Sequence, residues 1–137
     1  LLYGLCNYDV DVRLISPESL RIRSDSTYDI KKNSDFTEST KLEDHIDDLD
    51  VLYVTRIQKE RFPDEEEYLK VKGSYVVGED LVNQMKDDSI ILHPLPRIDE
   101  ISTEVDKTKN AKYFQQAEYG KYTRATLLGL TLNENGF

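Results

Sequence analysis

Residues 93–100 read His-Pro-Leu-Pro-Arg-Ile-Asp-Glu and follow the apolar run Ile90-Ile91-Leu92. The apolar run predicts a buried β-strand, so two prolines and three charges stand where that strand leaves its sheet. Proline fixes φ and removes a backbone donor, so Pro94 and Pro96 cannot continue a helix or a sheet and leave rigid carbonyls exposed. Ligands of open α/β folds bind at the carboxyl ends of the strands. The stretch therefore predicts either a loop whose carbonyls bind a substrate ammonium group or an ordinary strand exit made rigid by proline.

A second stretch has the same design. The apolar residues 51–54 predict another buried strand, and they lead directly into Thr55-Arg56-Ile57-Gln58-Lys59-Glu60-Arg61. The whole chain has a formal net charge of −9. An anionic substrate that approaches an acidic protein needs a local positive pocket. The cations Arg56, Lys59 and Arg61 form such a basic cluster.

Composition bounds the class of protein. The chain has 137 residues, of which 38% are hydrophobic and 33% charged, as expected for one globular domain with a solvated surface. The acidic balance argues against nucleic acid as a partner, and no apolar run is long enough to predict a membrane partner. A single cysteine, Cys6, excludes an internal disulfide and a multi-cysteine metal site, which fits a cytoplasmic protein.

The pattern of predicted elements alternates between strands and helices. Strands are predicted at 10–15, near 36, at 51–54, at 90–92 and near 111–114. Helices are predicted after Ser16-Pro17, from a capping box at 40–43 to 49, at 79–85 and at 117–132, with a short helix and a mobile loop over 21–35. This order predicts an α/β fold: a three-layer parallel sheet with helices on both faces, Rossmann-like, in which the two polar stretches lie at one carboxyl edge.

The two stretches together closely resemble the aspartate carbamoyltransferase family, whose aspartate-binding half contains T-R-[VI]-Q-K-E-R and H-P-L-P-R-x-D-E. The resemblance continues through 105–108, 113–116 and 127–130 and covers roughly residues 1–132. The sister family that acts on ornithine has a cysteine where Pro94 stands, so the proline favours aspartate. The family's G-R-T-x-H-S and S-T-R-T motifs are not present. The resemblance thus implies that residues 1–137 form an aspartate-binding domain and that the N-terminal carbamoyl-phosphate domain is absent.

The resemblance implies roles for four substrate-binding residues. Arg56 would bind the side-chain carboxylate of aspartate, because a guanidinium binds a carboxylate through two parallel hydrogen bonds and stays protonated. Gln58 would support it, while the carbonyls of Pro94 and Leu95 would hold the amine. The family also implies a cis peptide bond between Leu95 and Pro96.

A further set of residues would close or support the site. By resemblance, the segment that begins at Lys59 closes over the substrates, and Arg61 bridges to the absent half; the alternative is a surface loop with local ion pairs. A polar network would support the proline loop, with Arg124 as a partner from the last helix. His93 is predicted to be a hydrogen-bonded structural residue, and no catalytic residue is assigned in this half. The residues of the set are Lys59, Glu60, Arg61, Tyr68, Pro96, Arg97, Asp99, Glu100 and Arg124.

The implied activity is the transfer of a carbamoyl group from carbamoyl phosphate to L-aspartate, giving N-carbamoyl-L-aspartate and phosphate in pyrimidine biosynthesis. No metal or organic cofactor is expected: Asp44, His45, Asp47 and Asp48 line one predicted helix face, which is a poor metal cage. The implied partners are L-aspartate, carbamoyl phosphate through the missing domain, and a homotrimer, with regulatory subunits left open. Two alternatives remain, a non-catalytic ligand-binding or assembly module and a transcarbamoylase with another amino acid acceptor.

Overall fold

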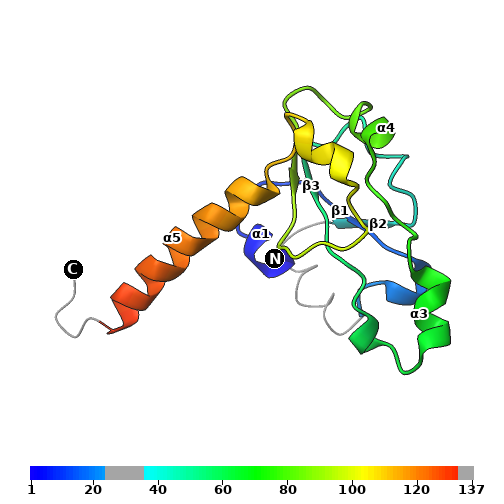
Figure 1. The fold of residues 1–137 in the computed structure, drawn as a ribbon, viewed down its shortest axis with the longest axis horizontal. Coiled ribbons are helices and arrows are strands. Elements are labelled where there is room, and N and C mark those ends of the chain that lie inside the picture. Colours follow the sequence, from blue (N-terminus) through cyan, green and yellow to red (C-terminus); the bar gives the residue numbers. More distant parts are fainter. Residues whose placement is uncertain (24–35, 133–137) are drawn as a thin grey trace. The chain divides into compact units, whose positions relative to one another are not determined.

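The structure, a computed structural model, describes residues 1–23 and 36–132 of the chain (Figure 1). The chain divides into two compact units, Leu1–His45 and Ile46–Phe137. All predicted substrate-binding and supporting residues belong to the second unit. Most of the short helix and loop predicted over 21–35 lies outside the described residues.

The first unit contains a pair of parallel strands. β1 pairs with β2 in a register that sets Val12 opposite Phe36 and Ile15 opposite Ser39. The predicted strand at 10–15 is therefore confirmed in its second part, and Pro17 precedes a 3₁₀ turn in place of the predicted α-helix. The elements are α1 (Leu2–Leu5), β1 (Val12–Ile15), η1 (Glu18–Leu20) and β2 (Phe36–Ser39).

The second unit is built around β4. β3 pairs with β4 in parallel, with Leu52 opposite Ile91. On the other side of β4, the N–H of Ile91 donates to the carbonyl of Asn110 at 2.7 Å and Lys112 donates to Ile91 at 3.0 Å. The elements are β3 (Val51–Tyr53), η2 (Lys59–Arg61), α3 (Glu65–Val71), α4 (Glu79–Val82), β4 (Ile90–Leu92), η3 (Thr103–Lys107) and α5 (Tyr113–Leu132).

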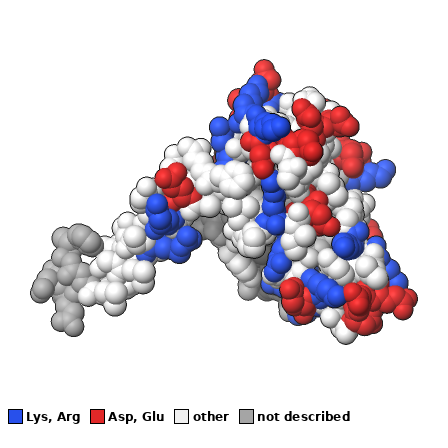
Figure 2. All heavy atoms as spheres, in the orientation of Figure 1, with Lys and Arg blue, Asp and Glu red and all other residues white. Residues whose placement is uncertain are grey.

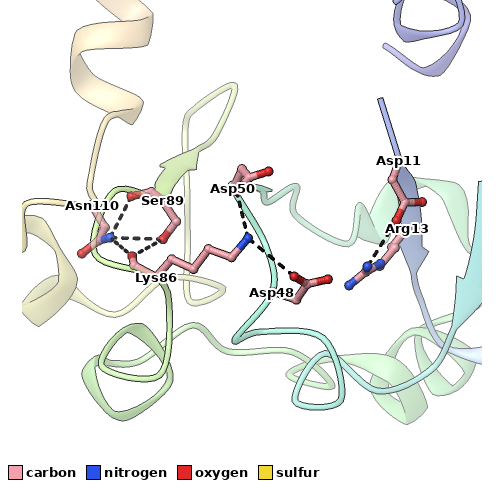
Figure 3. Close-up of polar contacts among 7 residues, drawn as sticks. All are labelled: Asp11, Arg13, Asp48, Asp50, Lys86, Ser89 and Asn110. Carbon is pink, nitrogen blue, oxygen red and sulfur yellow. Dashed lines mark hydrogen bonds and ion pairs between the residues drawn. The ribbon is translucent and has the colours of Figure 1, made fainter. Parts of the chain in front are cut away.

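Strand pairing places the two polar stretches at the same edge. The pairing of β3 with β4 extends one residue further, because the N–H of Val54 donates to the carbonyl of Leu92 at 2.9 Å. Both strands run in the same direction, so the chain leaves β3 toward Arg56 and leaves β4 toward Pro94 side by side. The amino ends are tied together separately, since Lys86 lies 3.5 Å from Asp48 and 3.0 Å from Asp50 (Figure 3).

Apolar side chains from successive segments form the core of the second unit. Ile91, in the central strand, is fully buried. The helix predicted at 79–85 ends at Val82 in the structure, but Val82 and Met85 of its predicted apolar face are both core residues. Each such side chain contributes roughly 1.5–3 kcal/mol when it is removed from water. The buried apolar residues of this unit are Ile46, Leu52, Val71, Val77, Val82, Met85, Ile91, Ile101, Val105 and Tyr113.

The prediction of a single three-layer sheet is met only at a coarser level. The described residues show a mixed α/β fold with parallel strands, but the strands form two separate two-stranded sheets, one in each unit. Beyond these sheets, parallel contacts are single bridges, Val77 with Ile101 and Ile91 with Ala111. The second bridge stays single because the chain enters α5 two residues after Ala111. The predicted strand near 111–114 is wrong for the same reason.

The predicted helix from 40 to 49 is also wrong. Residues 42–48 form consecutive turns, one of which is closed by the N–H of His45 and the carbonyl of Leu42 at 3.0 Å. Aspartate side chains at 44, 47, 48 and 50 compete with the backbone for hydrogen bonds and favour turns over helix interiors. Leu42 and Ile46 are nevertheless buried, so the apolar spacing identified core positions correctly.

The last helix is longer and more exposed than predicted. α5 begins at Tyr113 instead of 117, and Tyr113 is its one buried residue among those described. The stripe predicted to pack includes Tyr122, Leu128 and Leu132, which are 55%, 60% and 77% exposed. Residues 125–132 contain no charged side chain, and the outer part of α5 is almost free of charged atoms in Figure 2. No helix among the described residues is long and apolar enough to cross a membrane.

Candidate functional site

A small cavity lies between the segment after β3 and the end of the 93–100 loop. Its volume is about 60 Å³, room for a few water-sized groups. Its lining includes Arg56 from the segment after β3, Tyr68 from α3, and Ile98, Asp99 and Glu100 from the end of the 93–100 loop. The structure therefore brings together two stretches about 40 residues apart in the sequence, which parallel pairing of their strands predicts.

The guanidinium of Arg56 is available for a ligand. Arg56 has a side chain that is 33% exposed, and its Nη2 lies 4.0 Å from Oε1 of Glu60, at the outer limit of an ion pair. An exposed pair at that distance contributes little. Gln58, two residues further along the chain, is half-buried. It stands at the N-cap position of η2, where its side chain makes no capping hydrogen bond.

His93 occupies the centre of the loop after β4. Its ring is 1% exposed, its Nδ1 accepts the N–H of Leu95 at 2.8 Å, and its Nε2 lies 2.7 Å from Oε1 of Glu100. The backbone N–H of His93 donates to the side-chain oxygen of Gln116, on α5, at 2.8 Å. His93 is therefore buried and hydrogen-bonded, as predicted, while its structural role stays a prediction.

The peptide that follows has an unusual backbone. The bond between Leu95 and Pro96 is cis, as the family resemblance implies, and Leu95 has a φ of 51°. A left-handed conformation costs a residue with a Cβ roughly 1–2 kcal/mol. The hydrogen bond from the N–H of Leu95 to His93 offsets about 0.5–1.5 kcal/mol of that cost.

Glu100 closes the same loop. It is a buried residue whose Oε2 accepts the N–H groups of Ile98 at 3.1 Å and Asp99 at 3.2 Å. Burial alone would raise the pKa of Glu100, but hydrogen bonds from backbone N–H groups and from His93 outweigh it and lower the pKa. Glu100 is thus a supporting residue in its contacts, while Asp99 is exposed at the cavity.

Arg97 points away from the loop, to the base of α5. Its two terminal nitrogens bind the two carboxylate oxygens of Asp106, with Nη2 at 2.6 Å, and Nη1 also donates to the hydroxyl of Tyr113 at 3.0 Å. Asp106 accepts a further hydrogen bond from Tyr113. The guanidinium carbon lies 5.4 Å from the ring centre of Tyr113 and 5.9 Å from that of Phe114, which adds cation–π attraction.

These contacts shift the titration of both partners of Arg97. The hydrogen bonds from Arg97 lower the pKa of Asp106. Burial, with the hydrogen bond to Asp106, raises the pKa of Tyr113 to about 12. Arg124, the partner predicted for the loop, instead lies with its guanidinium over Gly120, one turn earlier on α5. Within the described residues, no hydrogen bond or ion pair joins Arg124 to the loop.

The predicted closure segment is held by local contacts. Nζ of Lys59 lies 2.5 Å from Oε1 of Glu65, which raises the pKa of Lys59 and lowers that of Glu65. Tyr68 packs edge-on against Phe62 with ring centres 5.7 Å apart, and Tyr68 also lines the cavity. Arg61, at the end of η2, is exposed. Within the described residues, no group of three or more His, Cys, Asp or Glu side chains could hold a metal ion.

Sequence reasoning missed three residues that fix the site. Asp106, Tyr113 and Gln116 stand in segments that the family shares, but their contacts with the 93–100 loop were not predicted. Their sequence separations from Arg97 and His93 are 9, 16 and 23 residues. A buried arginine in a loop needs a carboxylate partner, and that requirement is the one signal that could have pointed to Asp106.

Comparison with known proteins defines the class. Residues 1–131 match the family model described as aspartate/ornithine carbamoyltransferase, Asp/Orn binding domain. The chain therefore belongs to the aspartate/ornithine carbamoyltransferase family and corresponds to its amino-acid-binding domain.

The curated relatives described here are all aspartate carbamoyltransferases, whereas the family model also covers ornithine carbamoyltransferases. The chain is 88% identical over 137 residues to the aspartate carbamoyltransferase catalytic subunit of Nitrosopumilus maritimus, covering all of this chain and 44% of that subunit. It is 53% identical to the corresponding subunit of Thermococcus kodakarensis, with 99% and 44% covered.

Solved structures of aspartate transcarbamoylases have the same fold as this chain. The catalytic subunit of M. jannaschii aspartate transcarbamoylase superimposes with a TM-score of 0.85 at 47% identity, covering 98% of this chain and 44% of the other. Aspartate transcarbamoylase from Trypanosoma cruzi, in complex with carbamoyl phosphate and aspartate, gives 0.79 at 30% identity, with 86% and 40% covered. The chain thus spans less than half the length of the relatives it matches.

Proposed function

We propose that this chain is the aspartate-binding half of a carbamoyltransferase that converts carbamoyl phosphate and L-aspartate to N-carbamoyl-L-aspartate and phosphate in pyrimidine biosynthesis, in the cytoplasm. The observation that supports it most is that parallel pairing brings the segments after β3 and β4 to one sheet edge, where Arg56 and residues 98–100 line one cavity; Gln58, Pro94 and Leu95 lie in the same two segments but not in that lining. The similarity to aspartate carbamoyltransferase catalytic subunits supports the choice of reaction.

In this function, Arg56 would bind the side-chain carboxylate of aspartate. The substrate carries two carboxylates and one ammonium group, so it is a net anion that would approach a chain with net charge −9, and fixed positive charge has to offset repulsion. The guanidinium of Arg56 makes no close pair among the described residues, and a bidentate carboxylate would complete its hydrogen bonds at about 1.5–3 kcal/mol each. Gln58 would add a neutral donor beside it.

The proposal assigns the amine to the carbonyls of Pro94 and Leu95. A carbonyl oxygen accepts hydrogen bonds from an ammonium group and still orients the amine once it has lost its proton. The attack requires that uncharged amine, so the ammonium group must first lose one proton to solvent. The nitrogen loses a second proton as the new C–N bond forms and the C–O bond to phosphate breaks, and the departing phosphate is the proposed acceptor of that second proton. His93 is unsuited to that role, because both ring nitrogens are already engaged, with Leu95 and Glu100.

Binding of carbamoyl phosphate and polarisation of its carbonyl group would be the work of residues outside this chain. The relatives are more than twice as long, and a cavity of about 60 Å³ cannot enclose two substrates. A separate domain would bind carbamoyl phosphate and polarise its carbonyl, in a homotrimer to which regulatory subunits could attach. Lys59, Glu60, Arg61 and Tyr68 would close over the substrates. The exposed apolar residues of α5 support docking against a further body, since isolated domains rarely expose so much apolar surface.

A chimera tests the proposal. These 137 residues replace the matching part of the N. maritimus subunit, to which they are 88% identical. The chimera is expected to form N-carbamoyl-L-aspartate, and the 137-residue chain alone is expected to give negligible turnover. An inactive but folded chimera would contradict the proposal, and so would substantial turnover by the chain alone.

The acceptor is tested in the same assay. The family includes ornithine carbamoyltransferases, and a cationic ornithine side chain would be repelled by Arg56. L-Aspartate is therefore expected to be used and L-ornithine not. A chimera that binds aspartate without turnover would instead favour the alternative of a ligand-binding module.

A further inference from the structure

We propose that His93 is a positioning residue for the substrate amine: its neutral ring holds the N–H of Leu95 and thereby fixes the direction of the Pro94 and Leu95 carbonyls. The inference rests on the proposed function, since it assigns those carbonyls to the amine of aspartate. This role differs from general packing, because it requires a hydrogen bond from Leu95 to one particular ring nitrogen of His93, Nδ1.

Geometry determines where the ring proton lies. The N–H of Leu95 points at Nδ1 of His93 at 2.8 Å, so Nδ1 must present its lone pair. The proton therefore lies on Nε2, which faces Oε1 of Glu100 at 2.7 Å. Glu100 already accepts two backbone N–H groups on its other oxygen, from Ile98 and Asp99, which suits an ionised carboxylate. Both neighbours thus select the same neutral tautomer.

Sequence makes this hydrogen bond decisive for the loop. Among residues 94–96, two are prolines, so Leu95 has the one backbone N–H of the tripeptide. That N–H is bound to His93 while Leu95 is in the left-handed conformation, with φ of 51°. The ring is 1% exposed, so water cannot take over the contact if the ring nitrogen is lost. The carbonyls on either side of this N–H therefore depend on Nδ1 for their direction.

Two substitutions separate the functions of the two ring nitrogens. In His93→Asn, the side-chain oxygen stands near the position of Nδ1 and can accept the N–H of Leu95, but nothing reaches Glu100. In His93→Gln, the amide nitrogen can reach Glu100, but the acceptor for Leu95 is displaced. Both variants are made in the chimera with N. maritimus, and thermal unfolding is measured alongside KM and kcat.

The inference predicts opposite orders for stability and binding. His93→Asn is expected to be the less stable variant, because it removes a donor from buried Glu100, yet its KM for aspartate stays within about threefold of the unsubstituted chimera. His93→Gln is expected to raise KM for aspartate about tenfold or more, the effect of one lost hydrogen bond, with KM for carbamoyl phosphate unchanged. Equal KM values for aspartate in both variants, or a higher value in His93→Asn, would overturn it.

A spectroscopic measurement stands apart from activity. The chain has two histidines, so ¹⁵N labelling of histidine gives few signals, and His93 is expected to show the Nε2–H tautomer. A proton on Nδ1 would refute the inference. If the unsubstituted chimera makes no product, the proposed function fails; if it is active and the two variants bind aspartate alike, this inference alone fails.

Discussion

Arg56 and Arg97 have the same side chain in opposite surroundings. Arg97 is half-buried, binds both oxygens of Asp106 and lies over two aromatic rings. Within the described residues, the one ion pair of Arg56 is with Glu60 at 4.0 Å, and Arg56 borders a cavity. A guanidinium whose donors are satisfied within the fold supports structure, whereas one with free donors beside a cavity can bind a ligand.

Substitution of Arg56 should therefore affect binding more than stability. In the chimera, Arg56→Lys is expected to weaken aspartate binding by roughly 10- to 150-fold, the loss of one charge-assisted hydrogen bond worth about 1.5–3 kcal/mol, and Arg56→Ala, which loses both, is expected to weaken it further. Lysine keeps the charge but not the planar fork. Calorimetric titration measures the change, and Arg21→Ala, at an exposed pair with Glu18, serves as the control. Unchanged affinity in Arg56→Ala would remove the assignment.

Tyr113 predicts a loss of stability at alkaline pH. Its pKa is raised from the ordinary value of 10.0 to about 12 in the folded chain. The unfolded chain therefore releases the phenol proton first, and stability that is complete below pH 10 is lost as pH rises toward 12. Tyr113→Phe is expected to flatten this decline, at a cost of about 1 kcal/mol at neutral pH. Urea unfolding between pH 9 and 11 measures it, and an equal decline in both proteins would contradict the assignment.

At the scale of elements, short apolar runs were the dependable signal. The runs 51–54 and 90–92 correspond to β3 and β4, although only the central residue of each strand, Leu52 and Ile91, is buried, and Val51 and Tyr53 are exposed. The helix expected from 40 to 49 is replaced by turns in a stretch where Asp44, Asp47 and Asp48 compete with the backbone for hydrogen bonds. α5 starts earlier than predicted because Tyr113 is drawn into the contacts with Arg97 and Asp106, a tertiary effect that local sequence does not encode.

The pairing of Arg97 with Asp106 ties the 93–100 loop to the segment before α5. A double-mutant cycle with Arg97→Met and Asp106→Asn is expected to give a coupling energy of about 1–3 kcal/mol, since both side chains are partly buried. The exposed pair of Lys109 and Asp87 is the matched control, with an expected coupling below about 1 kcal/mol. Urea unfolding provides the free energies. Equal coupling in the two pairs would show that burial does not strengthen the first.

At the scale of the whole molecule, the sequence predicted that the segments after β3 and β4 lie at one sheet edge, but not which contacts hold them there. Parallel strands that neighbour each other place their carboxyl ends together, so Arg56 and the proline loop could be assigned to one site from order alone. The contacts that fix the loop come from Asp106, Tyr113 and Gln116, and their arrangement depends on how η3 and α5 return to the sheet. No local pattern encodes that return path.

The chain as a whole should lose stability in acid. Backbone and His93 hydrogen bonds lower the pKa of Glu100, and Arg97 lowers that of Asp106. For groups of this kind, the stabilisation is present above the unfolded pKa, near 4.5 and 3.8, and is lost as pH falls through the lower folded values. Glu100→Gln is expected to reduce the slope of unfolding free energy against pH below about 4.5. An unchanged slope in urea titrations would contradict this.

Several polar contacts of residues 93–100 lie within that segment. His93 binds Leu95 and Glu100, and Glu100 binds the N–H groups of Ile98 and Asp99, all within eight consecutive positions. A graft of these eight residues behind the last residue of a strand in an unrelated parallel scaffold would therefore bring part of its own bonding with it. The new scaffold would still have to supply counterparts of Gln116 and Asp106, which bind His93 and Arg97 from outside the segment.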